Sequence, residues 1–252
     1  MQQGLNDYYV TWADGKGAGI KGVELGFANL ELGLVGAEGP SYTATSKLSG
    51  IKLGDDISMD LAALYGFNND AVAADRDYNS YHLIAKVSGF GQNFYYRRAD
   101  NVSDSMSWGQ KEGLTSDYFS VDGSYSLNDQ TGLEYLASYH IIDEPTDDAD
   151  RDTMNVIVRP TYQWNDIHST WLEAGYSVVD FDTGEENSAY KVTLSQNIAV
   201  GGVTWARPML RFYATAGNTD TEKTYNGDTK LWEGTDSTTD PLIVGAMFEA
   251  WW

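Results

Sequence analysis

Apolar and polar residues alternate along most of this chain. In residues 170–178 one set of alternate positions is Leu172, Ala174, Tyr176 and Val178, and the other is Trp171, Glu173, Gly175 and Ser177. The same two-residue period recurs near 81–87, 133–141, 190–196 and 242–252. No stretch keeps a helical period of 3.6 residues for three turns, so the pattern predicts β-strands throughout.

The lengths of these segments and of their connections favour a membrane barrel over a soluble β-sandwich. The segments run for about ten residues or more, which suits a tilted strand that crosses a bilayer. Aromatic residues gather at segment ends, for example Tyr162 and Trp164. Tight turns at 89–91, 128–130 and 165–166 contrast with polar stretches that we expect to be long loops, at 71–79, 101–113, 143–152, 182–188 and 218–240. We therefore expect an all-β fold, a transmembrane antiparallel β-barrel with roughly thirteen strands.

Composition agrees with this prediction. The 252 residues are 13% aromatic, with 17 Tyr and 8 Trp, yet the mean hydropathy is only -0.41. Interfacial aromatic girdles together with a polar lumen and polar loops give this combination. The chain has no cysteine, which excludes disulfides and thiolate metal sites, and its net charge of -21 argues against nucleic-acid binding. A charge of this sign would also suit a general, cation-preferring diffusion pore.

The start of the chain has neither the basic nor the apolar region of a signal peptide. Single-chain bacterial barrels have even strand numbers, whereas our count is odd. We therefore expect that the signal peptide and the first strands are missing. On this interpretation residues 1–252 form a single partial β-barrel domain.

Strand parity selects candidate functional residues. Trp205 shares parity with Arg207 and Arg211, and Trp251 shares parity with Glu249, so both tryptophans are predicted to face the polar lumen. A tryptophan on the polar wall of a membrane strand is out of place unless something stacks on it, although it could instead pack beneath an inward loop. For Arg159, Arg207 and Arg211 we favour a role in wall electrostatics, or pairing with Glu173 and Glu249, over direct contact with a solute.

No catalytic, metal or cofactor motif emerges from the residues. His82, His140 and His168 are scattered without the spacing of metal ligands. The acidic run 147–152 lacks the glycine and glutamate spacing of an EF-hand. We therefore expect a protein that is not an enzyme and that has no cofactor and no bound metal.

Five segments of the C-terminal part resemble a known family. They are 158–164 (VRPTYQW), 169–176 (STWLEAGY), 190–196 (YKVTLSQ), 205–215 (WARPMLRFYAT) and 245–252 (GAMFEAWW). In order and spacing they resemble maltoporin, of the sugar-porin family. The resemblance implies an eighteen-stranded barrel that forms homotrimers in the outer membrane of a Gram-negative bacterium. It further implies facilitated diffusion of maltose- and maltodextrin-like saccharides.

The resemblance also assigns roles to residues. Residues 1–15 look like the end of the family's constriction loop, with Asp7 and Tyr9 as its polar and aromatic members, and 19–252 look like barrel strands and loops. Trp205, Trp251 and Phe90 match the aromatic slide along which sugars pass, and Arg207, Arg211 and Glu249 would be polar groups beside it. The terminal Trp252 resembles the signal read by the outer-membrane assembly machinery, and lipid or lipopolysaccharide would surround the wall. A carbohydrate-binding β-sandwich is the soluble alternative.

Overall fold

The computed structural model describes residues 17–36, 41–68, 79–102, 110–201 and 206–250. The strands in its first half are β1 (Gly17–Glu24), β2 (Asn29–Gly36), β3 (Ser41–Lys52), β4 (Ile57–Asn68), β5 (Ser80–Gly89), β6 (Gln92–Val102) and β7 (Gln110–Ser126). They are followed by β8 (Thr131–Asp143), the short 3₁₀-helix η3 (Asp147–Ala149), β9 (Arg151–Gln163), β10 (His168–Phe181), β11 (Glu186–Ala199), β12 (Met209–Asn226), β13 (Leu231–Thr239) and β14 (Leu242–Glu249). In these ranges no helix is long and apolar enough to cross a membrane.

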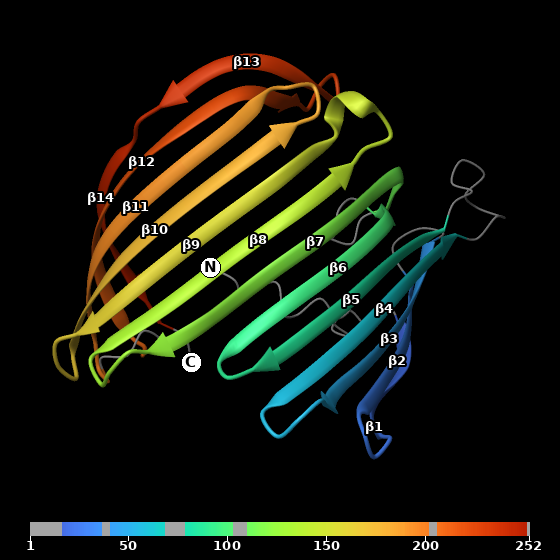
Figure 1. The fold of residues 1–252 in the computed structure, drawn as a ribbon, viewed down its shortest axis with the longest axis horizontal. Helices are drawn as coiled ribbons and strands as arrows, with labels where there is room; N and C mark the ends of the chain where they lie inside the picture. Colours follow the sequence, from blue (N-terminus) through green and yellow to red (C-terminus); the bar gives the residue numbers. More distant parts are fainter. Residues whose placement is uncertain (1–16, 37–40, 69–78, 103–109, 202–205, 251–252) are drawn as a thin grey trace. The chain divides into compact units, whose positions relative to one another are not determined.

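All fourteen strands belong to one sheet, in which each strand from β1 to β13 is hydrogen-bonded to its neighbours in the sequence (Figure 1). The pairing is antiparallel, for example between β9 and β10 and between β10 and β11. The last strand, β14, pairs with β12. The prediction of an all-β, antiparallel fold is confirmed.

Three predicted loops differ from the structure, of which 101–113 overlaps the end of β6 and the start of β7. The stretch 218–240 contains the second half of β12 and all of β13, joined by a turn in which the Lys230 amide donates to the Asn226 carbonyl at 2.8 Å. Threonines at 219, 221 and 224 explain the extended backbone, because β-branched residues favour strands even where both faces are polar. The expected loop 182–188 is also shorter, since β11 already begins at Glu186.

The same correction explains the strand count. Residues 209–216 of β12 pair with β14, and residues 219–226 of β12 pair with β13. Thus β13 and β14 both pair with β12, each with a different half of that strand. Fourteen strands, two of which share one side of β12, agree with the expected number of roughly thirteen strands.

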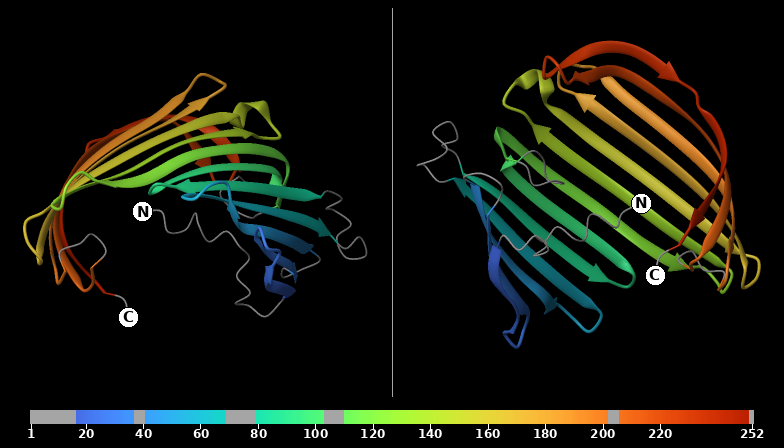
Figure 2. Two further views of the ribbon diagram at one scale, coloured as in Figure 1. Left: turned by 60° about the horizontal axis from the view of Figure 1, so that its bottom comes forward. Right: turned by 180° about the vertical axis from the view of Figure 1, so that it is seen from behind.

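The chain divides into two compact units. Unit 1 comprises Met1–Phe119 and His140–Thr146, and unit 2 comprises Ser120–Tyr139 and Asp147–Trp252. Unit 2 contains β9 to β14 whole, and these strands lie side by side in a curved sheet (Figure 2). The expectation that residues 1–252 form a single domain stays a prediction.

In unit 2 the polar face of the sheet is shielded and the apolar face is exposed. Glu173 pairs with Thr193 across β10 and β11, and Thr193 pairs with Thr215 on β12, so these residues share a face. Glu173 is only 8% exposed, whereas its neighbour Leu172, on the opposite face, is 44% exposed. This burial is the inverse of a soluble domain and is typical of a strand wall whose apolar side meets lipid.

The end of the chain follows the same rule. The side chains of Leu242, Val244 and Phe248 are 77%, 77% and 69% exposed. Their strand neighbour Glu249 points to the other face, where it pairs across the sheet with Met209. In unit 1, Leu83 and Phe94 are exposed while His82 and Arg97 are buried. Each unit thus has the same inverted arrangement.

Candidate functional site

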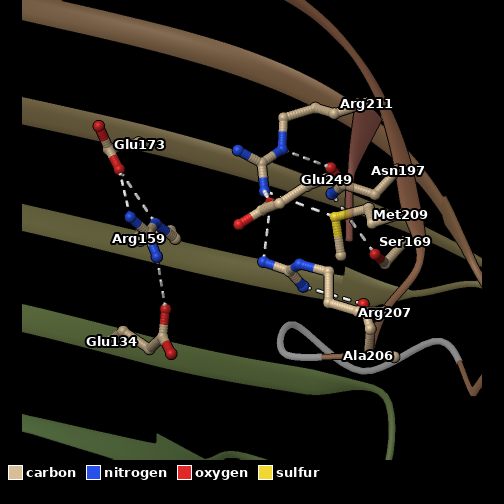
Figure 3. Close-up of polar contacts among 10 residues, drawn as sticks. All are labelled: Glu134, Arg159, Ser169, Glu173, Asn197, Ala206, Arg207, Met209, Arg211 and Glu249. Carbon is tan, nitrogen blue, oxygen red and sulfur yellow. Dashed lines mark hydrogen bonds and ion pairs between the residues drawn. The ribbon is translucent and has the colours of Figure 1, made fainter. Parts of the chain in front are cut away.

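A row of ion pairs crosses four strands of unit 2 on the polar face. Arg159 of β9 donates to Glu173 of β10 from Nε at 3.0 Å and from Nη2 at 2.6 Å. Its Nη1 donates to Glu134 of β8 at 3.0 Å. Lys191 of β11 reaches the other oxygen of Glu173 at 3.1 Å. Figure 3 shows Arg159 between its two carboxylates, which gives a charge order of minus, plus, minus, plus around the wall.

A second polar group joins β11, β12 and β14 in the same unit. Glu249 accepts from Arg207 at 2.8 Å and from Arg211 at 3.4 Å, so one carboxylate lies between two guanidinium groups (Figure 3). Arg211 Nε also donates to the side-chain oxygen of Asn197 at 3.0 Å. The Asn197 amide lies 3.5 Å from the Ser169 hydroxyl. These contacts tie one end of the β12–β14 pair to β10 and β11.

Strand register brings these residues together. Arg211 is directly opposite Asn197, Asn197 is directly opposite Ser169, and Glu249 is directly opposite Met209. Directly opposed side chains lie on one face about 5 Å apart, within reach of a guanidinium group. Arg207, just before β12, reaches Glu249 from the chain that leads into the strand.

Trp171 is a further member of this site. It pairs across the sheet with Thr161 and Ser195 and is 6% exposed, packed against Ala199 and Met209. The guanidinium carbon of Arg211 lies 4.0 Å from the centre of a Trp171 ring, and that of Arg159 lies 4.8 Å from it. Two cations against one indole form a cation–π arrangement that links the two polar groups of the wall.

The sequence also contains a signal for Trp171. Trp171 alternates with Leu172 and shares parity with Glu173, as Trp205 does with Arg207. The parity argument that selected Trp205 therefore applies equally to Trp171. What parity cannot show is which cations on β9 and β12 lie next to the ring, because that depends on the register of three strands.

Three of the predicted site residues, Arg207, Arg211 and Glu249, lie together in unit 2. Their predicted pairing is confirmed, as is that of Arg159 with Glu173. Phe90 belongs to unit 1, where it forms the turn between β5 and β6 with φ of 53° and an exposed side chain. Outside the described residues lie Asp7, Tyr9, Trp205, Trp251 and Trp252. The binding roles stay predictions.

Unit 1 has a comparable row of cations and aromatic rings. The Lys86 ammonium lies 5.5 Å from the ring centre of Tyr95, and the Arg97 guanidinium lies 5.9 Å from Tyr95 and 5.8 Å from Tyr118. The Tyr118 ring meets His140 edge to face at 5.5 Å. Arg97 is 1% exposed. A buried guanidinium between aromatic faces is a fixed charge, which suits a wall with a set electrostatic pattern.

Lys223 forms a third polar group in unit 2, where strands meet loops. Lys223 is 5% exposed, and its ammonium donates to the Asp148 carbonyl at 2.7 Å and to the Thr183 hydroxyl at 2.6 Å. It also lies 3.5 Å from Glu185. The Thr183 hydroxyl donates to the Glu185 carboxylate, and this bond chiefly lowers the pKa of Glu185 below its ordinary value. The lysine therefore ties η3 and the turn 182–185 to β12.

No group of three or more His, Asp or Glu side chains with a metal-binding arrangement occurs in the part of the chain that the structure describes. The acidic residues of the wall are instead paired with arginine and lysine. Their arrangement presents alternating fixed charges and hydrogen-bond donors along one face. Such a face is suited to guiding a polar, hydroxyl-rich solute, since the solute can pass from one hydrogen-bond donor to the next without binding any of them too strongly.

Comparison with known proteins gave one family and several solved structures. The family described as "LamB porin" matches residues 2–252. One similar structure is OmpT (in-vitro folded), an outer membrane protein of Vibrio cholerae, with a TM-score of 0.46, 14% identity, and coverage of 87% of this chain and 79% of that chain. A trimer form of OmpT gives 0.44 with 12% identity, covering 92% of this chain and 91% of that chain.

Proposed function

Because the chain belongs to the LamB porin family, we propose that it is a saccharide-selective channel of the outer membrane of a Gram-negative bacterium. The solutes are maltose- and maltodextrin-like saccharides, which cross by facilitated diffusion. The protein moves its solute unchanged, so its residues bind and release rather than catalyse. The inverted burial of the two sheet faces supports the membrane setting, since a wall that faces lipid exposes apolar side chains such as Leu242, Val244 and Phe248.

The observation that carries the proposal is the Arg207–Glu249 ion pair at 2.8 Å. Trp205 is two residues before Arg207 in the chain, and Trp251 is two residues after Glu249. The pair therefore joins the two chain segments that carry the predicted slide tryptophans. We propose that Trp205 and Trp251 supply stacking planes for the apolar face of the sugar ring, with the charged groups alongside.

The polar neighbours then act on the sugar hydroxyls. Arg211 donates from Nε to Asn197 and from Nη2 to Met209 and Glu249. In the described residues its Nη1 has no hydrogen-bond partner. That nitrogen is available to a passing hydroxyl. Donors of this kind discriminate in favour of hydroxyl-bearing solutes, because a polar group left unpaired in a narrow passage is costly. Weak, repeated contacts also allow release from each position to the next.

The other predicted components complete the proposal. Phe90, Asp7 and Tyr9 belong to the sugar path, and Trp252 is read by the assembly machinery of the outer membrane. The chain works as a homotrimer surrounded by lipid and lipopolysaccharide. A cation-preferring pore is less well supported, because the wall cluster of unit 2 pairs Glu134, Glu173 and Glu249 with Arg159, Lys191, Arg207 and Arg211.

Current recordings in planar bilayers test the proposal. Maltodextrin should block the ion current of the reconstituted chain, and Trp205→Ala should weaken the block by about 1–3 kcal/mol, or about 5- to 150-fold in the half-blocking concentration. Trp164→Ala is the matched control, because Trp164 is an exposed tryptophan at the turn after β9. A current that maltodextrin leaves unchanged contradicts sugar selectivity, and equal block in Trp205→Ala contradicts the stacking role.

A further inference from the structure

We propose that Trp171 is a positioning residue for the sugar path. Its ring fixes the guanidinium plane of Arg211, so that Arg211 Nη1 stays directed away from Asn197, Met209 and Glu249, which the other nitrogens of Arg211 contact. The inference rests on the proposed function, because the group that Arg211 would serve is a saccharide hydroxyl. It adds a residue whose ring touches the donor rather than the solute, and it explains why an indole is buried on the polar face of a strand.

The contacts of Arg211 show what holds its guanidinium group. Nε donates to Asn197 at 3.0 Å, while Nη2 makes two longer contacts, with Glu249 at 3.4 Å and with the sulfur of Met209 at 3.4 Å. Only the first of these distances is that of a good hydrogen bond. In this proposal the Trp171 ring, whose centre lies 4.0 Å from the guanidinium carbon, therefore supplies the surface that fixes the plane of the group.

The need for such a surface follows from the side chain itself. An arginine side chain has several rotatable bonds to fix, and its fork is useful for recognition only when its plane is set. A hydrogen bond at one end leaves rotation about the remaining bonds. An aromatic face against the flat guanidinium group removes that freedom without using any of its N–H donors. Nη1 thus keeps both of its protons for a solute.

Trp171 is well placed to act as a fixed support. It is 6% exposed and packs against Ala199 and Met209, so its own ring has little room to turn. Arg159 lies on the same indole at 4.8 Å and is itself held by three hydrogen bonds to two carboxylates. The indole is therefore held by the firmly hydrogen-bonded Arg159 and in turn supports Arg211, which has fewer good hydrogen bonds.

The indole nitrogen is not part of this role. Trp171 Nε1 is buried and has no hydrogen-bond partner in the described part of the chain. A substitution that keeps an aromatic plane but removes this nitrogen consequently loses no hydrogen bond. Phenylalanine should replace tryptophan with little effect on Arg211, whereas methionine fills similar space without a plane. The two variants separate positioning from simple filling of volume.

A double-mutant cycle in planar bilayers tests the proposal on the whole chain. Trp171→Met should raise the half-blocking maltodextrin concentration about three- to tenfold, and Trp171→Phe should stay within about twofold of wild type. Arg211→Met should raise it by at least as much as Trp171→Met. In the Arg211→Met background, adding Trp171→Met should change the block by less than about twofold, because the donor to be positioned is gone. Trp164→Met is the control for loss of a tryptophan.

Three results would overturn the proposal. Trp171→Met could leave the block unchanged. The effects of the two substitutions could multiply in the double variant, as two independent roles would. Finally, Trp171→Met could fail to form channels while Trp171→Phe forms normal ones, which would mark Trp171 as a residue needed for folding.

A second readout separates this inference from the proposed function. If maltodextrin fails to block even the wild-type chain, sugar selectivity is lost, yet the position of Arg211 still affects ion permeation. The reversal potential in a KCl gradient should then shift toward cation permeation in Trp171→Met, in the same direction as in Arg211→Met, and no further in the double variant. An unshifted potential in Trp171→Met would overturn the positioning role on its own.

Discussion

Replacing Arg159 by methionine tests how much the ion-paired wall contributes to stability. The substitution removes three charge-assisted hydrogen bonds, of 3.0, 2.6 and 3.0 Å, from Glu173 and Glu134. Truncating one partner of a buried ion pair typically costs about 3–5 kcal/mol. Glu173 keeps Lys191 at 3.1 Å, and the Glu134 side chain is 28% exposed, so both remaining carboxylates are partly compensated. We therefore expect a loss of about 2–3 kcal/mol.

The assay is urea unfolding of the protein in lipid vesicles, followed by tryptophan fluorescence. The midpoint should fall while the slope of free energy against urea stays constant, because the exposed surface is unchanged. Combining Arg159→Met with Glu173→Gln should recover part of the loss, since the uncompensated buried charge is then removed. Lys230→Met, in the turn between β12 and β13, is the control and should stay within about 0.5 kcal/mol of wild type.

Two results would refute this reasoning. One is an unfolding free energy for Arg159→Met within about 0.5 kcal/mol of wild type, which would place the pair among surface salt bridges. The other is further destabilisation by Glu173→Gln in the double variant, since the buried carboxylate would then have acted independently of Arg159.

Three further variants test other parts of unit 2. Gly217→Ala places a Cβ 2.5 Å from the carbonyl oxygen of Tyr190, so the strands must separate and urea unfolding should show a loss of about 1–3 kcal/mol. Lys223→Met should speed hydrogen exchange at 147–149 and 182–185 about tenfold, because the loops lose their shared donor. Thr183→Val should raise the pKa of Glu185 in an NMR titration, because the hydroxyl that lowers it is gone. Since the folded pKa is depressed, this carboxylate contributes fully above its unfolded pKa of about 4.3, and its contribution is lost as pH falls through the folded value.

Each of these three predictions would be contradicted by a specific result. Gly234→Ala, where an added Cβ meets no atom within 4 Å, is the control for Gly217→Ala, and equal effects of the two would exclude a steric cause. Unchanged exchange in Lys223→Met would show that the loops are held without the lysine. A Glu185 titration that does not move in Thr183→Val would exclude the hydroxyl as the cause of the lowered pKa.

Alternation along the chain predicted much of the fold, because a period of two residues fixes which side chains share a face. The exposure of Leu242 and Val244 follows from parity, and parity also places Arg211 and Glu249 on the polar face, where strand register then brings them together. Parity failed where both faces are polar. The run 218–226 has no apolar side, so its strand character depended on threonine propensity and on pairing with β13.

The wall cluster around Trp171 shows the second limit. Residues 159, 171 and 211 are far apart in the chain, and only the register of β9, β10, β11 and β12 places them together. A shift of one residue in any of these pairs would move one partner to the opposite face. Sequence alone gives the face of each residue, but it does not give the position of one strand along the next.

The central claim is that the apolar face of the sheet meets lipid and the polar face meets water. The chain contains no cysteine, so single-cysteine variants with spin labels report on chosen positions without background. Val192 and Thr193 are adjacent in β11 and point to opposite faces. In lipid vesicles the label at Val192 should be relaxed mainly by oxygen, which concentrates in the bilayer, and the label at Thr193 mainly by a water-soluble nickel chelate. A label at Val192 that the chelate reaches, or that neither reagent reaches, would contradict the account.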